Sequence, residues 1–378
     1  MNIPKLRFKD NNGNDYPQWE KKLIKDILKI YHGKDYKNEP NEKKLYPVLG
    51  TGGIITYIDK FLCDWECVLI GRKGTINKPQ YMKTPFWSVD TLFYSKPKLK
   101  QNPKFQYYLF QNINWKIYDE STGVPSLSAS TIEHINRFIP TYAEQEKIAS
   151  FFSTIDKKIE NLTNTITSLE NQKKGLLQQI FSQKLRFKDK NGNNYPNWEK
   201  KKLGDITTSY SGGTPSVNVK DYYNGTIPFI KSGEIHNSFT ETFITETGFN
   251  SSSAKLVKKG DLLFALYGAT SGDTSISKIN GAINQAILCV RSTTLNLHYL
   301  YQLLNFYRNK LLSIYLQGGQ GNFSATIFKN LIFNFPCLEE QTKIADFLSA
   351  FDRKLDNQKA QLEHWQQIKK GLLQQMFV

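Results

Sequence analysis

The string Lys5-Leu6-Arg7-Phe8-Lys9-Asp10 returns 179 residues later as residues 184–189. The likeness continues through Asn-Gly-Asn, Tyr-Pro, Trp-Glu-Lys-Lys and Asp-Ile, so that residues 4–27 match residues 184–206. An internal repeat of this kind constrains the architecture before any single residue is considered. The chain is therefore a duplication, with one copy of this framework segment in each half.

A second repeat has an offset of 196 residues. Residues 144–149 match residues 340–345, and the run Gly175-Leu176-Leu177-Gln178-Gln179 returns at residues 371–375. Between the repeated segments lie residues 28–139 and 207–335, which are much less alike in sequence. This pattern indicates one frame that carries two different middles, and faint matches between the middles predict that both have one fold.

Two long stretches, residues 141–182 and 337–378, have apolar side chains at alternating spacings of four and three and contain no proline. This spacing is typical of helices that pair in a coiled coil. Each helix of about 40 residues would span roughly 60 Å. We predict that they pair antiparallel as a spacer. The alternative is that each apolar stripe packs on its own globular domain. As spacer or partner-docking positions we name Ile148, Phe152, Ile155, Ile159, Leu162, Lys173, Ile344, Leu348, Phe351, Leu355 and Lys369.

Lys173 and Lys369 interrupt the two apolar stripes at matching places. A polar residue at one inward position can specify the register of a helix pair. We therefore hypothesise that these two lysines fix the register of the spacer helices.

The two middles contain short β-type runs, such as residues 67–70 and 261–265, followed by glycine-rich turns and helical stretches such as residues 297–316. The predicted fold is α/β (α+β). We expect domains at residues 1–140 and 183–336, and spacer helices at 141–182 and 337–378. Because the junction after the first helix resembles the two termini brought together, we expect a pseudo-two-fold arrangement in which the N-terminal segment packs near the end of the C-terminal helix.

The net charge of +16 indicates a polyanionic partner. The excess is +8 in residues 1–140 and +8 in residues 183–336, while both helical stretches are neutral. No apolar run is long enough for a membrane span, so we expect no membrane partner and a cytoplasmic location. The cysteines are scattered and lack zinc-site spacing, which favours reduced core thiols and no metal site.

Three glycine-rich loops, at residues 71–78, 211–216 and 267–272, carry basic and polar side chains. Lysine and arginine neutralise phosphate, and arginine, asparagine, glutamine and threonine can bond base edges. Trp19 and Trp198 are expected to be framework packing residues. The predicted DNA-binding residues are Thr51, Arg72, Lys73, Thr75, Asn77, Lys78, Ser211, Thr214, Ser216, Lys231, Tyr267, Thr270, Ser271 and Asn322.

The Tyr-Pro-x-Trp-Glu framework, the Gly212-Gly213-Thr214-Pro215-Ser216 loop, the segments 227–233 and 284–286, and the Glu-Gln-x-Lys-Ile-Ala start of a helix that ends in Gly-Leu-Leu-Gln-Gln are similar to type I restriction-modification specificity subunits. The resemblance covers essentially the whole chain. One departure is that the first domain lacks the Gly-Gly-Thr-Pro loop and has Asp90-Thr91 where Asn284-Gln285 stands in the second.

The resemblance implies two target-recognition domains, each of which reads one half of a split double-stranded DNA site, with the helices as a ruler. It implies that the helices dock two methyltransferase (modification) subunits and restriction subunits with ATP-driven translocation and cleavage. The chemistry and the cofactors, S-adenosylmethionine, ATP and Mg²⁺, belong to those partners. The chain itself is then a non-catalytic subunit without a cofactor.

Two other functions remain open from the residues alone. A stand-alone nuclease with duplicated reading heads would cut DNA with Mg²⁺ without partners, and Glu20-x-Lys22 with Asp10 or Asp15 only superficially resembles such a centre. A non-specific DNA-bridging or membrane-surface protein would bind all duplexes alike. No methylation motif, nucleotide fingerprint or phosphate-binding loop is present in the sequence.

Overall fold

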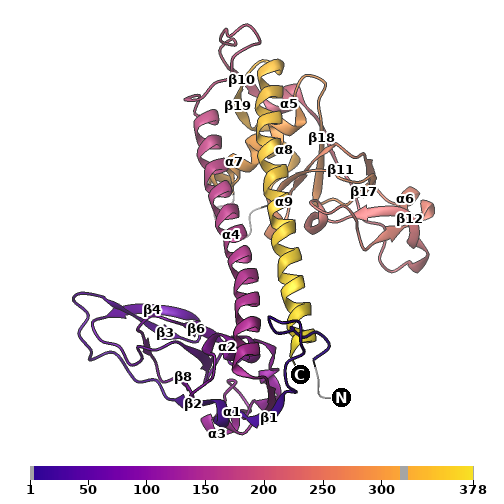
Figure 1. Ribbon diagram of the computed structural model, residues 1–378. Coiled ribbons are helices and arrows are strands. Elements are labelled where there is room, and N and C mark those ends of the chain that lie inside the picture. The colour runs from indigo at the N-terminus through magenta and orange to yellow at the C-terminus, as the bar shows by residue number, and fades with distance from the viewer. Residues whose placement is uncertain (1–3, 316–321, 378) are drawn as a thin grey trace. The chain divides into compact units, whose positions relative to one another are not determined.

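The computed structural model describes residues 4–315 and 322–377. Its chain forms two compact units, one of Met1–Asn164 with Lys359–Val378 (unit 1) and one of Thr165–Gln358 (unit 2). Each unit therefore holds one α/β body together with part of both long helices, which divides the chain differently from the four consecutive segments expected from sequence. Figure 1 labels the elements of both.

The body of unit 1 contains two small sheets. One has the strand order β2-β8-β5-β6, the other β4-β3-β7, and β1 pairs with β9 beside them. Only β3 and β7 pair in parallel among these strands. The elements of this body are β1 (Glu20–Leu23), α1 (Ile24–Ile27), β2 (Leu28–Tyr31), β3 (Tyr46–Gly50), β4 (Gly53–Ile58), β5 (Cys67–Gly71), β6 (Gln80–Met82), β7 (Trp87–Ser88), β8 (Leu92–Pro97), α2 (Pro103–Asn112), η1 (Trp115–Tyr118), α3 (Ala129–Glu133) and β9 (Asn136–Ile139).

The body of unit 2 repeats this topology with one additional strand, β14, which pairs with β17. Its sheets have the orders β11-β18-β15-β16 and β13-β12-β17-β14, its parallel pair is β12 with β17, and β10 pairs with β19. The elements are β10 (Glu199–Lys202), α5 (Leu203–Ile206), β11 (Thr208–Ser211), η2 (Lys220–Tyr222), β12 (Tyr223–Ile230), η3 (Ser232–Glu234), β13 (Phe243–Ile244), α6 (Glu246–Asn250), β14 (Lys255–Val257), β15 (Leu262–Ala265), η4 (Gly268–Thr270), β16 (Thr274–Ile276), β17 (Gly281–Ile283), β18 (Ile287–Arg291), α7 (Leu297–Tyr315), α8 (Ala325–Asn330) and β19 (Ile332–Phe335). The prediction that both middles share one fold is confirmed. The helix expected to reach Leu316 is described to Tyr315, and Leu316 lies outside the described residues.

The central strand of each unit is apolar along its whole length because both of its faces are covered. In β5, Val68 and Ile70 point into the core beneath the helices, whereas Cys67 and Leu69 point into the core between the two sheets. In β15, Leu262 and Phe264 alternate with Leu263 in the same way. Side chains on a strand alternate between its faces, so an unbroken apolar run marks a strand buried on both sides.

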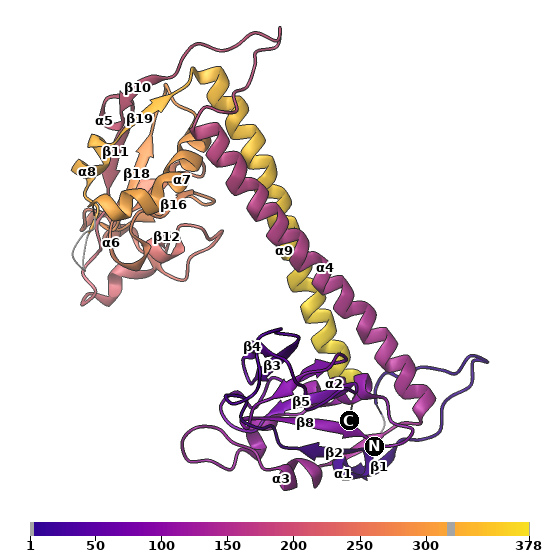
Figure 2. The same ribbon diagram turned by 90° about the vertical axis from the view of Figure 1, so that its left-hand side faces the viewer.

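The long helices are α4 (Tyr142–Phe181) and α9 (Leu338–Met376), drawn in Figures 1 and 2. Within unit 1, Ile148, Phe152 and Ile155 of α4 belong to the same core as Leu373 and Met376 of α9 and the α/β body. Within unit 2, Ile344 and Leu348 of α9 share a core with Ile180 of α4 and the body of that unit. The two interpretations of the apolar stripes, pairing of the helices and packing on a globular domain, are therefore both partly right. The helix ends pack on an α/β body as well as on each other.

Farther along the helices, most residues of the apolar stripes lie outside the α/β cores. Leu162 in unit 1 and Ile166, Leu169 and Leu355 in unit 2 are at most 8% exposed. Ile159 and Phe351 are only partly buried.

The two lysines that interrupt the apolar stripes have ion-pair partners on the opposite helix. In unit 1, Nζ of Lys369 lies 2.7 Å from Oδ1 of Asp156, whose other oxygen accepts from the Tyr108 hydroxyl of α2 at 2.7 Å. In unit 2, Lys173 pairs with Asp352, which also accepts from the Gln302 amide of α7 at 2.6 Å. Each aspartate thus joins the partner helix to its own α/β body, an arrangement that supports the hypothesis on helix register.

A buried glutamate anchors the framework segment of each unit. Glu144, in the first turn of α4, is fully buried and accepts from Nη2 of Arg7 at 2.7 Å, from Nε of Arg7 at 3.0 Å and from Nε1 of Trp19 at 3.1 Å. In unit 2, Glu340 of α9 accepts from Arg186 at 2.7 and 3.2 Å and from Trp198 at 3.1 Å. The expectation that the tryptophans serve the framework is confirmed.

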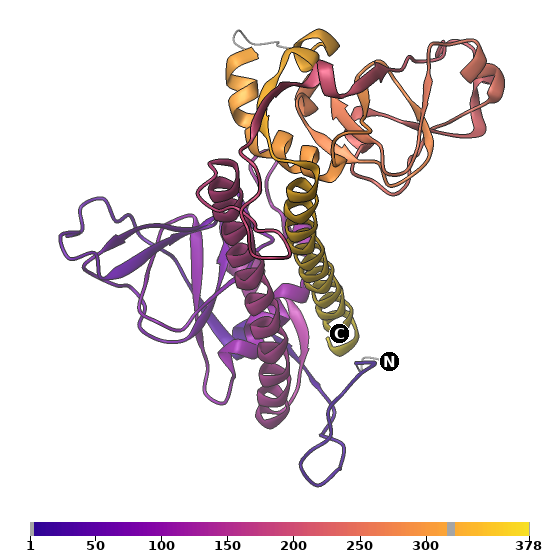
Figure 3. The same ribbon diagram turned by 90° about the horizontal axis from the view of Figure 1, so that it is seen from above.

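The N-terminal segment of the described chain packs on the end of α9. The Leu6 amide donates to the Gln375 carbonyl at 3.1 Å, and in unit 2 the Leu185 amide donates to the Gln179 carbonyl of α4 at 3.0 Å. Figure 3 shows this segment beside the C-terminal end of α9. The placement expected from the match of termini and internal junction is thus confirmed.

We predict that Arg7→Met lowers the free energy of unfolding by about 3 kcal/mol, because it leaves the Glu144 carboxylate buried without its cation. Urea unfolding at pH 7, followed by tryptophan fluorescence, measures the change. The control is Lys9→Met, since Lys9 pairs only with Asp15 at 3.8 Å on the surface and its loss should cost less than about 0.5 kcal/mol. Equal effects of the two substitutions would contradict the anchor role of Arg7.

Candidate nucleic-acid interface

In unit 1, three loops meet at one end of the sheet that contains β5. The Arg72 amide donates to the Thr91 carbonyl at 2.8 Å, and the Arg72 carbonyl accepts from the Leu127 amide at 2.9 Å. The Gly74 amide donates to the Pro125 carbonyl at 2.8 Å. These bonds bring the basic loop after β5 together with the loop before β8 and the loop before α3.

In unit 2, the corresponding loops are joined by the same backbone bonds. The Leu266 amide donates to the Ala286 carbonyl at 2.8 Å, and the Leu266 carbonyl accepts from the Phe323 amide at 2.8 Å. The loop after β11 joins this group, since the Thr214 hydroxyl donates to Oε1 of Gln285 at 2.7 Å. Both units therefore gather polar loops at the equivalent sheet end.

The shared bonds correct the alignment of the two domains by one residue. Thr91 occupies the position of Ala286, so Asp90-Thr91 corresponds to Gln285-Ala286, not to Asn284-Gln285 as the sequence comparison placed it. The loops on either side differ in length, and little sequence identity remains there to fix the alignment. Asp90 is therefore the counterpart of Gln285, and the two domains differ in hydrogen-bonding capacity at this place, because a carboxylate only accepts whereas the glutamine amide accepts and donates.

The first domain also has a counterpart of the glycine loop that it was expected to lack. A Cβ on Gly212 would lie 1.8 Å from the Ile283 carbonyl oxygen, and a Cβ on Gly33 would lie 2.0 Å from that of Val89. Each glycine thus lets the chain after the first sheet strand press against the backbone of the neighbouring sheet. Gly33 precedes Gly212 by 179 residues, the offset of the framework repeat, and Tyr31 matches Tyr210 in the same way, so the sequence held a signal for this match.

Most predicted DNA-binding side chains are exposed. These are Arg72, Lys73, Asn77, Lys78, Ser211, Thr214, Ser216, Lys231, Tyr267 and Asn322, while Thr51, Thr75 and Thr270 are partly buried. The hydrogen bonds above place Arg72 and Lys73 in the loop cluster of unit 1. They place Thr214 and Tyr267 in the loop cluster of unit 2. Asn77, Lys78 and Ser216 lie farther along their loops.

Ser271 is placed differently from an exposed contact residue. It is 4% exposed, its hydroxyl donates to the Leu266 carbonyl at 3.3 Å, and its carbonyl accepts from Nη2 of Arg308 at 3.1 Å. Polar residues in a glycine-rich loop can face either way, and here the serine faces inward. Its side chain supports the loop and is removed from the contact set.

Two exposed polar groups beside the unit 2 loops were absent from the predicted contact set. Gln285 holds Thr214, and Nε2 of His236 lies 3.0 Å from Oδ2 of Asp273, which follows the predicted loop. Gln285 stands in the Asn-Gln-Ala segment that carried the family resemblance, which was the available signal. His236 and Asp273 are 37 residues apart, and no sequence pattern joins them.

The Type I restriction modification DNA specificity domain, as a family model, matches residues 16–171 and 195–364. The two matches cover most of the chain and fall one on each half of the duplication. The chain belongs to this family.

Several individual proteins support this assignment. The MjaVIII specificity subunit of Methanocaldococcus jannaschii is 23% identical over 97% of this chain and 94% of its own length. The MjaIX specificity subunit of the same organism is 30% identical over 52% of this chain and 48% of its own. The crystal structure of a type I restriction-modification S subunit from M. genitalium covers 100% of this chain and 99% of its own at a TM-score of 0.72 and 16% identity. The two-domain fold with paired long helices is thus that of specificity subunits.

The described parts of this specificity subunit contain no group of three or more His, Cys, Asp or Glu side chains arranged to hold a metal ion. The carboxylate of Asp10 accepts from the amides of Asn12 and Asn14, and Glu20 pairs with Lys22 at 2.8 Å. Among the described helices, none is long and apolar enough to cross a membrane.

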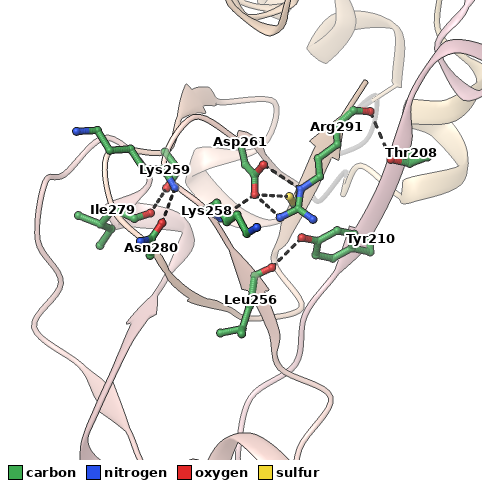
Figure 4. Close-up of polar contacts among 11 residues, drawn as sticks. Thr208, Tyr210, Leu256, Lys258, Lys259, Asp261, Ile279, Asn280 and Arg291 are labelled. Atoms are coloured by element: carbon green, nitrogen blue, oxygen red, sulfur yellow. Dashed lines mark hydrogen bonds and ion pairs between the residues drawn. The ribbon is translucent and has the colours of Figure 1, made fainter. Parts of the chain in front are cut away.

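An ion pair between the buried Asp261 and the partly exposed Arg291 lies at the opposite end of the central unit 2 strand, away from the loops, and Figure 4 shows its contacts. Asp261 is 8% exposed and accepts from Nε and Nη2 of Arg291 at 2.9 and 2.6 Å and from the Lys258 amide at 2.7 Å. Arg291 also lies over the Tyr210 ring at 5.4 Å. In unit 1, Cys67 of β5 and Lys96 of β8 stand at the positions of Asp261 and Arg291, so this ion pair belongs to the second domain.

Burial alone would raise the pKa of Asp261, but the hydrogen bonds from Arg291 and from the Lys258 amide hold that pKa below its usual value. Because the folded pKa lies below the unfolded one, this carboxylate stabilises the fold fully at neutral pH, and the contribution is lost as the pH falls from about 4 through the folded pKa.

We predict that Asp261→Asn lowers stability at pH 7 and flattens its dependence on pH below about 4. Unfolding curves from pH 7 to 2.5 measure both. Asn in place of the exposed Asp221 serves as the control and should leave the curve nearly unchanged. If the Asp261→Asn variant lost stability below about pH 4 as steeply as the wild type, the role assigned to the Asp261–Arg291 ion pair would be contradicted.

Proposed function

We propose that this specificity subunit reads a bipartite double-stranded DNA target, with the loops of each α/β domain contacting one half-site. The observation that carries the proposal is the repeated frame. The same Arg–Glu–Trp anchor and the same backbone bonds present two loop clusters whose side chains differ, with Arg72 and Lys73 in one and Thr214, Gln285 and Tyr267 in the other. Different side chains at equivalent positions of the two domains allow each domain to recognise a different half-site.

The charge of the two loop-bearing segments supports contact with phosphate. Residues 1–140 and 183–336 each carry an excess of eight positive charges, and the exposed Lys231 follows the strand that pairs in parallel with β17, next to Asn284. Phosphate contacts set affinity and position, whereas polar side chains at base edges set sequence. Both kinds of side chain occur in each cluster.

The long helices then act as a ruler and as a docking surface. The two helical stretches are neutral overall in sequence, and the Lys–Asp pairs fix which turns meet within each unit. In this proposal two methyltransferase subunits and restriction subunits bind the helices, and S-adenosylmethionine, ATP and Mg²⁺ bind those partners. The chain itself contributes recognition and no catalytic group, in the cytoplasm.

The readings as a nuclease or a non-specific bridging protein lose support. Family membership favours sequence recognition over both. The acidic residues that resembled a nuclease centre are occupied within their own loop or strand, as described above.

We predict that deleting only this chain from cells that keep the partner methyltransferase removes methyladenine from one split sequence motif. Genome-wide mapping of methyladenine in the two strains measures this and gives both half-sites. Restoring the full chain should restore the same motif. An unchanged map in cells with an active methyltransferase would contradict the proposal.

We predict that Arg72→Ala lowers the affinity of the assembled complex for its target about ten-fold or more, and that Lys231→Ala lowers it with a shallower salt dependence. Fluorescence anisotropy with the target duplex at several salt concentrations measures both. Lys25→Ala, an exposed lysine on α1 at the other end of the sheet, is the matched control. Affinity equal to that of the control would remove the tested residue from the contact set.

A further inference from the structure

The β3–β4 hairpin of unit 1 exposes two neighbouring isoleucines. Val48 pairs with Thr56 and Leu49 pairs with Ile54, so Ile55 is an extra residue in β4. Such a bulge redirects side chains that would otherwise alternate between faces. As a result Ile54 is 57% exposed and Ile55 is 53% exposed, side by side on the edge strand of the sheet.

The hairpin is held in place beside the basic loop. The Gly50 carbonyl accepts from Nε2 of Gln80 at 2.8 Å, and the Leu49 carbonyl accepts from the Val89 amide at 3.1 Å. The hydroxyl of Thr51 would lie 3.9 Å from a Cβ on Gly74, which belongs to the basic loop. The tip of the hairpin is therefore part of the same loop cluster as Arg72 and Lys73.

Ile55 is seated against its own hairpin. A Cβ on Gly50 would come within 2.8 Å of Cδ1 of Ile55, so the glycine gives that side chain room to lie across the strand. The turn between β3 and β4 consists of Thr51 and Gly52. Gly53, which follows, has a φ of +112°, and this lets the chain turn tightly. The bulge and the glycines together give β4, the edge strand of the three-stranded sheet, an apolar and β-branched outer edge.

An exposed apolar edge beside cationic side chains fits one chemical feature of DNA. The 5-methyl group of thymine is an apolar surface in the major groove, and apolar side chains can contact it there. Arg72 and Lys73 are exposed in the neighbouring loop, where they can neutralise phosphate. We propose that Ile54 and Ile55 are specificity-determining residues that contact thymine methyl groups in the half-site of the first domain.

The second domain lacks this device at the equivalent place. After β12 its chain continues through the exposed Lys231 into η3, and Glu234 accepts from the Lys231 amide at 3.1 Å. A longer connection with Lys231 and Glu234 replaces the glycine turn, and on the equivalent edge strand β13 no pair of isoleucines is exposed, since Ile244 is fully buried and Phe243 is 38% exposed. The inference therefore concerns one half-site only, and it rests on the proposed function of reading a split target.

The test replaces thymine by uracil, one position at a time, in the mapped target duplex bound by the full chain assembled with its methyltransferase partner. Loss of one contacted methyl group should weaken binding by a factor of about four at one or two thymines of the first half-site. Ile54→Ala and Ile55→Ala should weaken binding to the thymine duplex by a similar factor. With either variant the uracil substitution should then have no further effect.

Leu99→Ala is the matched control, because Leu99 is a 90% exposed aliphatic residue of the same unit that lies after β8. It should keep full sensitivity to uracil. The inference is overturned if the first half-site contains no thymine on either strand, if the wild-type uracil series is flat there, or if Ile54→Ala stays as sensitive as the wild type. It is likewise overturned if the isoleucine variants change only the assembly state in sedimentation, which would assign the edge to a protein partner. A wild-type complex with no preferred sequence at all would instead contradict the proposed function itself.

Discussion

The structure depends on a carboxylate that is buried in the first turn of each long helix. Glu144 and Glu340 each accept two bonds from one arginine and one bond from one tryptophan, and both of those partners come from the framework segment. A buried carboxylate without such donors would be strongly unfavourable, whereas near a helix N-terminus and fully bonded it is stabilised. The anchor therefore forces the framework segment and the helix start to fold together, once in each unit.

This anchor explains how the middle segments can differ so widely. The framework strand β1 pairs with β9 through Glu20 and Ile139, and β10 pairs with β19 through Glu199 and Phe335. The chain thus enters and leaves each variable body at two neighbouring strands that are fixed by the frame. Loops at the far end of the sheet then change without disturbing the helices, because the buried contacts that fix the helices lie elsewhere. Recognition and assembly are separated within one chain.

The repeated elements could be predicted from the sequence, and the loops could not. Repetition showed the frame, the helices, the placement of Leu6 beside the end of α9 and the framework role of Trp19, because near-identical segments must make near-identical contacts. The sequence did not show that Thr91 matches Ala286 or that Ser271 turns inward. These features follow from backbone packing between segments far apart in the chain. Some residues of the apolar stripes pack on an α/β body and others pack on the partner helix. Periodicity alone does not show which residues do which, because the difference depends on burial.

We propose that the frame is common to both units and that each variable body reads its own half-site. The most direct measurement exchanges residues 207–335 for the corresponding segment of a related specificity subunit and maps methyladenine in cells with the same methyltransferase. We expect that one half of the split motif changes, while the other half and the spacing stay as they were. A change in both half-sites, or in neither, would contradict it.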